Sequence, residues 1–301
     1  MQAFNIAKLR GQNLAFPLLL LCGIMFSLRI VTNKLVLDAG MQPVQLGILG
    51  NFASALILLP MLIYRGQKVP MGKEHIALYL SLGLVSFTLP SLLSFYVVTR
   101  VGAGYTASVY CLSPMLTMLL ASIFGMERLF LKRVIAILVA LIAVTVLLQQ
   151  QFALIHFDQH LWVIVGLSIP LCAAVGNIIR SAFWPKGSTP LSFSFATLIA
   201  SSLMLMPLAP LIEEPSTWQF FSGNIIVLFL IGAAISCLSF VLNYRLQALA
   251  GPVFFSQVGS VGTGFGIFFG ALLFGEGVTF AMVAALIVIV VASQKAKAQS
   301  S

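Results

Sequence analysis

A basic residue in the middle of an apolar stretch is the first feature of this sequence that could do chemistry. Arg29 lies midway along an apolar run at about residues 16–37. A charged side chain at the centre of a bilayer costs about 2.5–3.5 kcal/mol or more, so it requires a compensating role. Thr32 and Asn33 follow at i+3 and i+4 and share a helical face with Arg29. A guanidinium on such a face can form paired hydrogen bonds with a carboxylate or a phosphate.

A second apolar run carries a similar polar face. Asn177, Arg180 and Ser181 repeat the spacing of i, i+3 and i+4. We expect both polar faces to border a central cavity, in which Arg29 or Lys34 would meet an anionic group of a substrate. For Lys34 and Arg180 the alternative is that they extend to the lipid head groups, because both lie near the ends of their runs.

Polar residues in two further runs complete the candidate binding site. Tyr105 and Ser108 lie in one run, and Gln257 and Ser260 lie in another. The alternative for a tyrosine near a membrane face is a place in the interfacial aromatic belt. Small hydroxyl residues also assist helix packing without touching a ligand.

Glycines recur at intervals of four near the end of the chain, at Gly262, Gly266 and Gly270. This spacing is typical of a seam along which two membrane helices approach closely. A phosphate-binding loop is excluded, because no lysine–threonine pair follows the glycines and no strand precedes them. A potassium filter would need four copies around an axis. We therefore predict a structural role for these glycines.

The elements that position these residues are predicted to be transmembrane helices. Of the 301 residues, 60% are hydrophobic and only 8% are charged, and the mean hydropathy is +1.08. A soluble domain carries about 25% charged residues. The apolar runs are long and do not alternate, which favours helices over a β-barrel. Runs of about 20 residues, enough to cross a bilayer, occur at 16–37, 43–64, 75–98, 103–125, 131–149, 161–184, 190–212, 224–247, 252–274 and 277–294.

The distribution of lysine and arginine predicts the orientation in the membrane. The net charge is +9, but the basic residues separate the apolar runs and form no contiguous patch, so we expect no nucleic-acid binding. With a cytoplasmic N-terminus, 13 of the 16 basic residues fall on the inner side. An even number of helices then places the C-terminus inside as well. We expect residues 1–13 and 297–301 to be cytoplasmic.

The two halves of the sequence resemble each other. Phe124-Gly125-Met126-Glu127 stands near the end of the fourth run, and Phe274-Gly275-Glu276 stands near the end of the ninth. A glycine lies 25 residues before each glutamate. The sequence thus predicts two five-helix repeats, residues 14–150 and 151–296. Because five is odd, the second repeat must be inverted relative to the first, as in many transporters.

Ten helices in two repeats, with glycine–glutamate motifs at Glu127 and Glu276, resemble the EamA-type drug/metabolite transporters. Pro114, thirteen residues before Glu127, and Lys34 match further positions of this family. Two departures are Thr263, where the proline would recur, and Phe26-Ser27, where tryptophan–glycine is frequent.

The resemblance implies a secondary transporter that works by alternating access, most often an exporter of amino acids or related metabolites. Relatives with this fold carry sugar phosphates, nucleotide sugars or drugs, and these substrates, together with nucleosides, stay open as alternatives. The resemblance also implies an integral protein of a bacterial inner membrane. We expect its partners to be a small-molecule substrate, with protons or a counter-solute for coupling, and the lipid bilayer. We expect a monomer or loose dimer.

Other functional classes are less consistent with the sequence. It contains no HExxH or GxSxG motif and too few acidic residues for a catalytic dyad, so we predict no enzymatic activity. It also lacks a nucleotide-binding or cofactor signature, and we expect no cofactor. A membrane-embedded enzyme and a channel are the alternatives from different classes.

Overall fold

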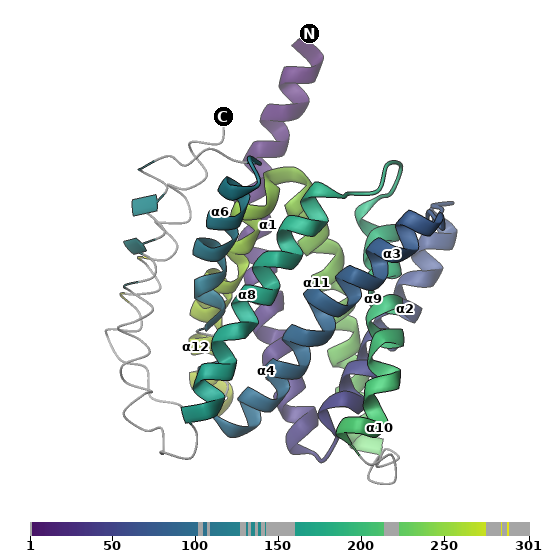
Figure 1. The fold of residues 1–301 in the computed structure, drawn as a ribbon, viewed down its shortest axis with the longest axis vertical. Helices are drawn as coiled ribbons and strands as arrows, with labels where there is room; N and C mark the ends of the chain where they lie inside the picture. Colours follow the sequence, from purple (N-terminus) through teal and green to yellow (C-terminus); the bar gives the residue numbers. More distant parts are fainter. Residues whose placement is uncertain are drawn as a thin grey trace.

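The computed structural model describes residues 2–101, 105–106, 109–126, 160–213 and 223–274, with residues 131, 134–135, 138–139, 142, 284 and 288. Every regular element in these residues is helical (Figure 1). In chain order the elements are α1 (Gln2–Asp38), α2 (Pro43–Tyr64), α3 (Lys73–Leu82), the π-helical segment η1 (Gly83–Thr88), α4 (Leu89–Arg100), the 3₁₀ turn η2 (Tyr110–Leu112), α6 (Ser113–Ile123), α8 (His160–Ala182), α9 (Pro190–Leu205), the 3₁₀ turn η4 (Met206–Leu208), α10 (Ala209–Ile212), α11 (Gly223–Ser256) and α12 (Val258–Phe274).

Six helical segments of the described chain are long and apolar enough to cross a membrane. They are Leu14–Asp38, Pro43–Tyr64, Lys73–Arg100, Leu161–Ala182, Pro190–Ile212 and Ile225–Ser256. The all-helical membrane class is thereby confirmed. The count of ten and the inverted repeats stay predictions, since the runs at 131–149 and 277–294 lie largely outside the described residues.

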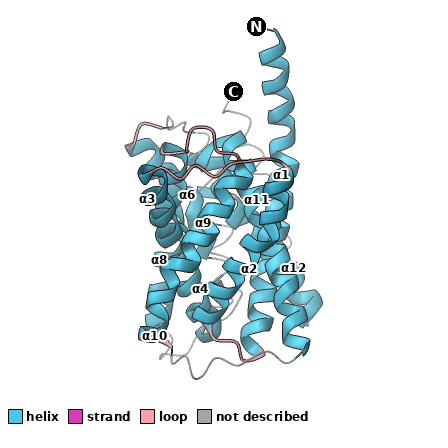
Figure 2. Cartoon of the chain, turned by 90° about the vertical axis from the view of Figure 1, so that its right-hand side faces the viewer, coloured by secondary structure: helices cyan, strands magenta, loops and turns pink. Residues whose placement is uncertain are grey.

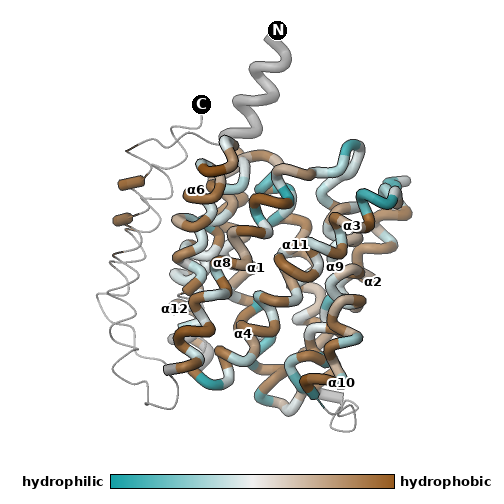
Figure 3. The backbone as a smooth tube through the Cα atoms, viewed as in Figure 1, coloured by the Kyte–Doolittle hydropathy of each residue, from teal (hydrophilic) through white to brown (hydrophobic). Residues whose placement is uncertain are grey.

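Hydrophobic residues predominate along the helices of the bundle (Figure 3). Large apolar side chains are exposed on several helices, among them Ile63 on α2, Ile164 on α8 and Phe268 on α12. Lipid tails can cover such a surface without cost, whereas water cannot. The surface therefore fits a bilayer.

Helices from the two halves of the chain pack against each other. α1 packs against α11 and α12, α2 packs against α9, and α4 and α6 both pack against α8. The helices run side by side along the long axis in both views (Figures 1 and 2). Residues before and after the midpoint of the chain thus build one bundle together.

Glycines permit the close approach of α1 and α12. A Cβ atom at Gly23 would lie 2.6 Å from Cγ1 of Val261, and one at Gly262 would overlap the ring of Phe26. The Ser27 hydroxyl donates a hydrogen bond to the carbonyl of Gly262 at this contact. Gly262 therefore serves helix packing, as small residues do at membrane helix interfaces.

Three predicted helices are not regular along their whole length. The third run contains η1, the fourth contains η2 directly before α6, and the ninth is interrupted at Gln257, between α11 and α12. Gly251 also leaves helical geometry, with φ of 78°. Irregular backbone at membrane depth is tolerated where it is buried in protein or lines a cavity. The helices predicted over 75–98, 103–125 and 252–274 thus contain irregular turns at these points.

The end of α10 is tied to the beginning of α2 by a carboxylate. Oε1 of Glu213 accepts a hydrogen bond from the backbone N–H of Val44 (2.7 Å), and Oε2 accepts one from Gln45 (3.3 Å). These amides are among the N–H groups that lack partners at a helix N-terminus, where negative charge is favourable. The sequence showed this residue only as an acid in a loop.

Candidate functional site: a central cationic cavity

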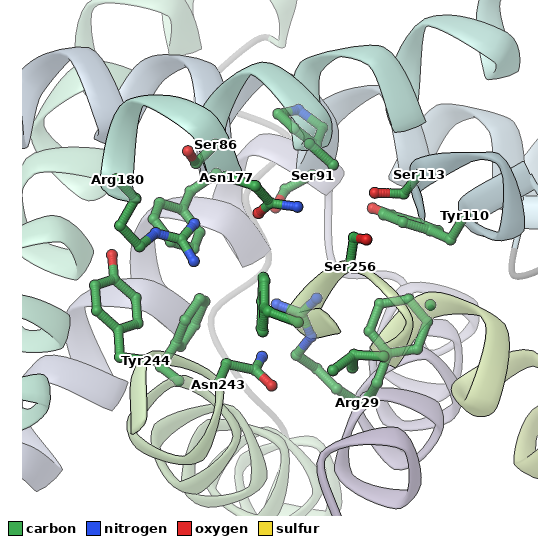
Figure 4. A pocket seen from close by; sticks show the side chains of 18 residues that line it. Arg29, Ser86, Ser91, Tyr110, Ser113, Asn177, Arg180, Asn243, Tyr244 and Ser256 are labelled. Atoms are coloured by element: carbon green, nitrogen blue, oxygen red, sulfur yellow. The ribbon is translucent and has the colours of Figure 1, made fainter. Parts of the chain in front are cut away.

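A cavity of about 90 Å³ lies in the middle of the bundle (Figure 4). Its lining comes from α1, η1, α4, η2, α6, α8, α11 and α12. The polar and charged lining residues are Arg29, Ser86, Ser91, Tyr110, Ser113, Asn177, Arg180, Asn243, Tyr244 and Ser256. A water molecule needs roughly 10–15 Å³ on this scale. The cavity can therefore hold several waters or a small solute.

The irregular backbone segments meet at this cavity. Ser86 and Phe87 of η1, Tyr110 of η2, and Ser256 and Val258 on either side of the break at Gln257 all line it. Discontinuous helices commonly form the midplane site of transporters. The departures from regular helix thus coincide with the binding space.

Arg29 faces the cavity from α1, and no carboxylate among the described residues that line the cavity pairs with it. Its guanidinium carbon lies 5.4 Å from the ring centroid of Phe240 and 5.8 Å from that of Phe26. Its Nε is buried and has no hydrogen-bond partner. Aromatic faces attract a cation but supply no hydrogen-bond acceptor of the strength of a carboxylate. The donors of Arg29 stay available for a ligand.

Arg180 enters the cavity from α8 and is almost fully buried, with 3% of its surface exposed. Nη1 donates to Oε1 of Gln247 (2.7 Å). Nε2 of Gln247 in turn donates to the Asn177 carbonyl (2.8 Å) and the Ser181 hydroxyl (2.7 Å). The side chain of Arg180 therefore stays inside the bundle and does not extend to the head groups.

Three aromatic rings surround the Arg180 guanidinium. Its carbon lies 4.5 Å from the ring centroid of Tyr244 and 5.5 Å from those of Phe87 and Phe255. Nε has no hydrogen-bond partner. The rings restrict where the guanidinium can move, and they leave its free donors directed at the cavity (Figure 4).

No carboxylate of the described chain neutralises either arginine. Asp38 and Glu74 are exposed at helix ends, and Glu213 binds the N-terminus of α2. Buried charges in proteins are normally paired, because an unpaired one is costly to desolvate. The described lining therefore carries two positive charges that no acidic residue within it balances.

Amide and hydroxyl groups lie between the two arginines (Figure 4). Nδ2 of Asn177 donates to the Thr117 hydroxyl (3.4 Å). Oδ1 of Asn243 and the Ser86 hydroxyl are buried without a partner. Buried polar atoms are rarely left unpaired. Unpartnered atoms on four lining residues therefore indicate a site that a ligand or water completes.

Two smaller pockets adjoin the cavity, with volumes of about 40 and 30 Å³. Arg29, Asn33 and Ser91 line both of them. The 30 Å³ pocket extends to Asn51 on α2 and Ser236 on α11. Arg29 therefore stands where the central cavity meets polar space toward the C-terminal half of α1.

The structure brings some of the predicted site residues together and separates others. Arg29, Asn177 and Arg180 line the central cavity, and Asn33 lines the smaller pockets. Lys34 is half-buried and lines none of these three pockets.

The candidates on the fourth and ninth runs occupy other positions. The Tyr105 hydroxyl donates to the Val163 carbonyl on α8 (2.6 Å), where it packs beside Gly166. Gln257 and Ser260 are buried and stand outside the lining of the three pockets. Both polar atoms of the Gln257 side chain lack a partner. Ser108 lies outside the described residues.

The predicted structural residues are described in part. Pro114 stands in the first turn of α6, where its missing N–H is harmless. Gly266 and Gly270 lie on α12. Glu127 and Glu276 are outside the described residues.

Several lining residues were not predicted. Asn243 and Tyr244 on α11 and Ser86 on η1 belong to the cavity. A usable signal was present, because Asn243 and Gln247 are polar residues four apart near the end of an apolar run. Such a pair marks one face of a membrane helix as polar.

A helical membrane bundle with a small polar cavity among broken helices has the architecture of a solute transporter. Residues 13–149 match the model of the EamA-like transporter family. This match confirms the predicted resemblance to the EamA-type transporters over residues 13–149.

A solved structure shares the fold of almost the whole chain. One protein crystal structure superposes with a TM-score of 0.70 at 15% identity, over 92% of this chain and 96% of the other. At this identity the likeness concerns the fold alone. No curated protein matches the sequence significantly.

Proposed function

We propose that this protein is a secondary transporter that moves a small carboxylate-bearing metabolite, an amino acid or a related compound, out of the cell by alternating access. The observation that carries the proposal is the pair of arginines, half-buried Arg29 and buried Arg180, which face one cavity without an acidic partner among the described residues. A guanidinium binds a carboxylate through two parallel hydrogen bonds. The central cavity is then the substrate site.

Reciprocal helix contacts support the proposed inverted repeats. α1, the first helix of the proposed repeat 14–150, packs against α11 and α12 of the second half. α8, the first helix of the proposed repeat 151–296, packs against α4 and α6 of the first half. α2 and α9, each second in its half, pack against each other. A pseudo-two-fold relation between the halves produces this pattern, and rocking of such halves would alternate access to the cavity.

The proposed setting is the inner membrane of a bacterium, with both termini in the cytoplasm. The excess of lysine and arginine in the loops assigned to the inner side supports this orientation. We propose that a proton gradient or a counter-solute drives transport, without ATP or a cofactor, and that the protein acts as a monomer or loose dimer.

Uptake into proteoliposomes tests the proposed function. Purified protein is reconstituted, and uptake of a radiolabelled panel of amino acids and other carboxylates is measured with and without an imposed proton gradient. We expect saturable, mutually competitive uptake of some members, which is lost in Arg29→Gln. Absence of uptake throughout the panel would contradict the proposal. Flux that does not saturate would instead indicate a channel.

A further inference from the structure

We propose that the substrate carries two anionic groups, one bound by Arg29 and the other by Arg180. This inference rests on the proposed function and names the substrate class of the same cavity. The shared chemistry is that of a diacid, which a simple dicarboxylate or a dicarboxylic amino acid could supply.

The charge balance of the cavity favours a substrate with two negative charges. The described lining contributes two guanidinium groups and no carboxylate. A monoanion would leave one positive charge uncompensated in a small, poorly solvated space, and burying such a charge is costly. A solute with two negative charges brings the cavity to neutrality.

The positions of the two arginines favour a substrate with two separate acidic groups. Arg29 comes from α1 and Arg180 from α8, and they stand on different sides of the cavity with Asn177 and Asn243 between them (Figure 4). Phe26 and Phe240 contact Arg29, whereas Phe87, Tyr244 and Phe255 contact Arg180. Each guanidinium is thus held in its own aromatic environment. A ligand with acidic groups at two ends would meet one arginine with each group.

Each arginine has a hydrogen-bond donor without a partner among the described residues. Nε of Arg29 and Nε of Arg180 are both buried and unpartnered. Gln247 accepts from Nη1 of Arg180, and the unpartnered Nε leaves at least one donor on each arginine for an incoming oxyanion. Two oxyanions satisfy both sets, whereas one oxyanion satisfies a single set.

The described lining contains no group that would neutralise a positive charge on the substrate. An ammonium group would find only neutral oxygen atoms, such as the unpartnered Oδ1 of Asn243 and the Ser86 hydroxyl. These acceptors tolerate one ammonium group but do not neutralise it. A dicarboxylic amino acid, with one net negative charge, engages both arginines but leaves one positive charge uncompensated, so a simple dicarboxylate fits better and a neutral amino acid fits least.

Matched acid–amide pairs test the inference. The purified full-length protein is heated with butanedioate or its monoamide, and with L-glutamate or L-glutamine, and the shift in Tm is converted to an apparent Kd. We expect each diacid to bind about ten- to a hundredfold more tightly than its monoamide, because each lost charge-assisted contact is of that size. Uptake of the same four labelled compounds is measured in proteoliposomes.

Three variants locate the effect. Arg29→Gln and Arg180→Gln should each reduce the diacid's advantage over its monoamide to about twofold or less, and Arg180→Lys, which keeps the charge, should retain most of it. If a variant does not fold, the acid–amide comparison in the unmodified protein decides alone.

The outcomes separate the two proposals. Monoamides that bind and are transported as well as the diacids would overturn this inference and leave the proposed function standing. Diacid binding with the expected preference but without uptake would contradict the proposed function and support the inference. A preference for butanedioate over L-glutamate would identify the substrate as a simple dicarboxylate, and the reverse would identify a dicarboxylic amino acid.

Discussion

Gln247 orients Arg180 at the cavity through a neutral contact. Its amide oxygen accepts from Nη1 of Arg180, while its amide nitrogen donates to the Asn177 carbonyl and the Ser181 hydroxyl. A neutral acceptor orients the guanidinium without cancelling its charge. A carboxylate in the same place would form an ion pair with Arg180 and compete with an anionic substrate.

Replacement of Gln247 by glutamate should therefore lower substrate affinity. We expect Gln247→Glu to raise the apparent Kd for the transported anion by about ten- to a hundredfold, the size of one charge-assisted contact. The measurement is competition for uptake in proteoliposomes. Gln247→Met is the matched control, because it removes the hydrogen bonds that orient Arg180 but adds no negative charge. Its loss of substrate affinity should be smaller than that of Gln247→Glu. Equal affinity in Gln247→Glu and the unmodified protein would contradict this role.

At the scale of single residues, the sequence predicted part of the site. Arg29 and Arg180 could be identified because a charge in an apolar run is costly and needs a reason. Asn243 and Tyr244 could not be identified in the same way, since amides and tyrosines are tolerated at many places in a membrane helix. Which face of a helix borders the cavity depends on its neighbours, and α11 has neighbours on several sides.

At the scale of elements, the seam between α1 and α12 depends on the absence of a side chain at Gly262. We expect Gly262→Ala to lower the free energy of unfolding by about 1–3 kcal/mol, because the added methyl overlaps the ring of Phe26. Thermal unfolding in detergent measures the change.

Gly50→Ala provides the control for this seam. A Cβ atom there would lie 3.7 Å from Leu46 Cδ1, which is an ordinary contact. Alanine also favours a helix more than glycine does, by up to about 1 kcal/mol. The control should be neutral or stabilising. A Gly262→Ala protein as stable as Gly50→Ala would show that the seam is not tightly packed.

The contact between α10 and α2 supports a second prediction at this scale. Glu213→Gln removes the negative charge from the N-terminus of α2, and we expect a loss of about 0.5–2 kcal/mol in the free energy of unfolding. Glu74→Gln is the control, because that acid is exposed in the first turn of α3. Its loss should be smaller than that of Glu213→Gln. Equal losses in the two variants would mean that the buried contact adds nothing.

The sequence predicted where most described helices begin and end but not where they break. Pro43 and Pro190 each open a helix, and both positions were apparent from composition. The π-helical segment η1 has no comparable signal. Gly83 lies there directly against Ala200 and Ser201 of α9, and Ser86 lies against Gly176 of α8. Tertiary packing of this kind cannot be read from an apolar run.

At the scale of the whole molecule, the proposed orientation assigns each loop to one side of the membrane. Lys68 and Lys186 lie in exposed loops on the side assigned to the cytoplasm, and Ala39 lies in a loop on the opposite side. In a background without the native cysteines, Ala39→Cys should react with an impermeant maleimide in intact cells. Lys68→Cys and Lys186→Cys should react only after permeabilisation. The reverse pattern would invert the topology.

The reciprocal contacts of α1 and α8 support the proposal that one cavity, between the two halves of the protein, is the substrate site. Asn243 lies in that cavity between the two arginines (Figure 4). A cysteine in its place would report occupancy directly, because a bound solute blocks access to the thiol.

The decisive measurement is the rate at which Asn243→Cys, in the same cysteine-free background, reacts with a small thiol reagent in proteoliposomes, with and without a solute that this variant transports. We predict that the solute slows the reaction in proportion to its occupancy of the site, while the rate at Lys186→Cys stays unchanged. A transported solute that leaves the rate at Asn243→Cys unchanged would contradict the assignment of this cavity as the substrate site.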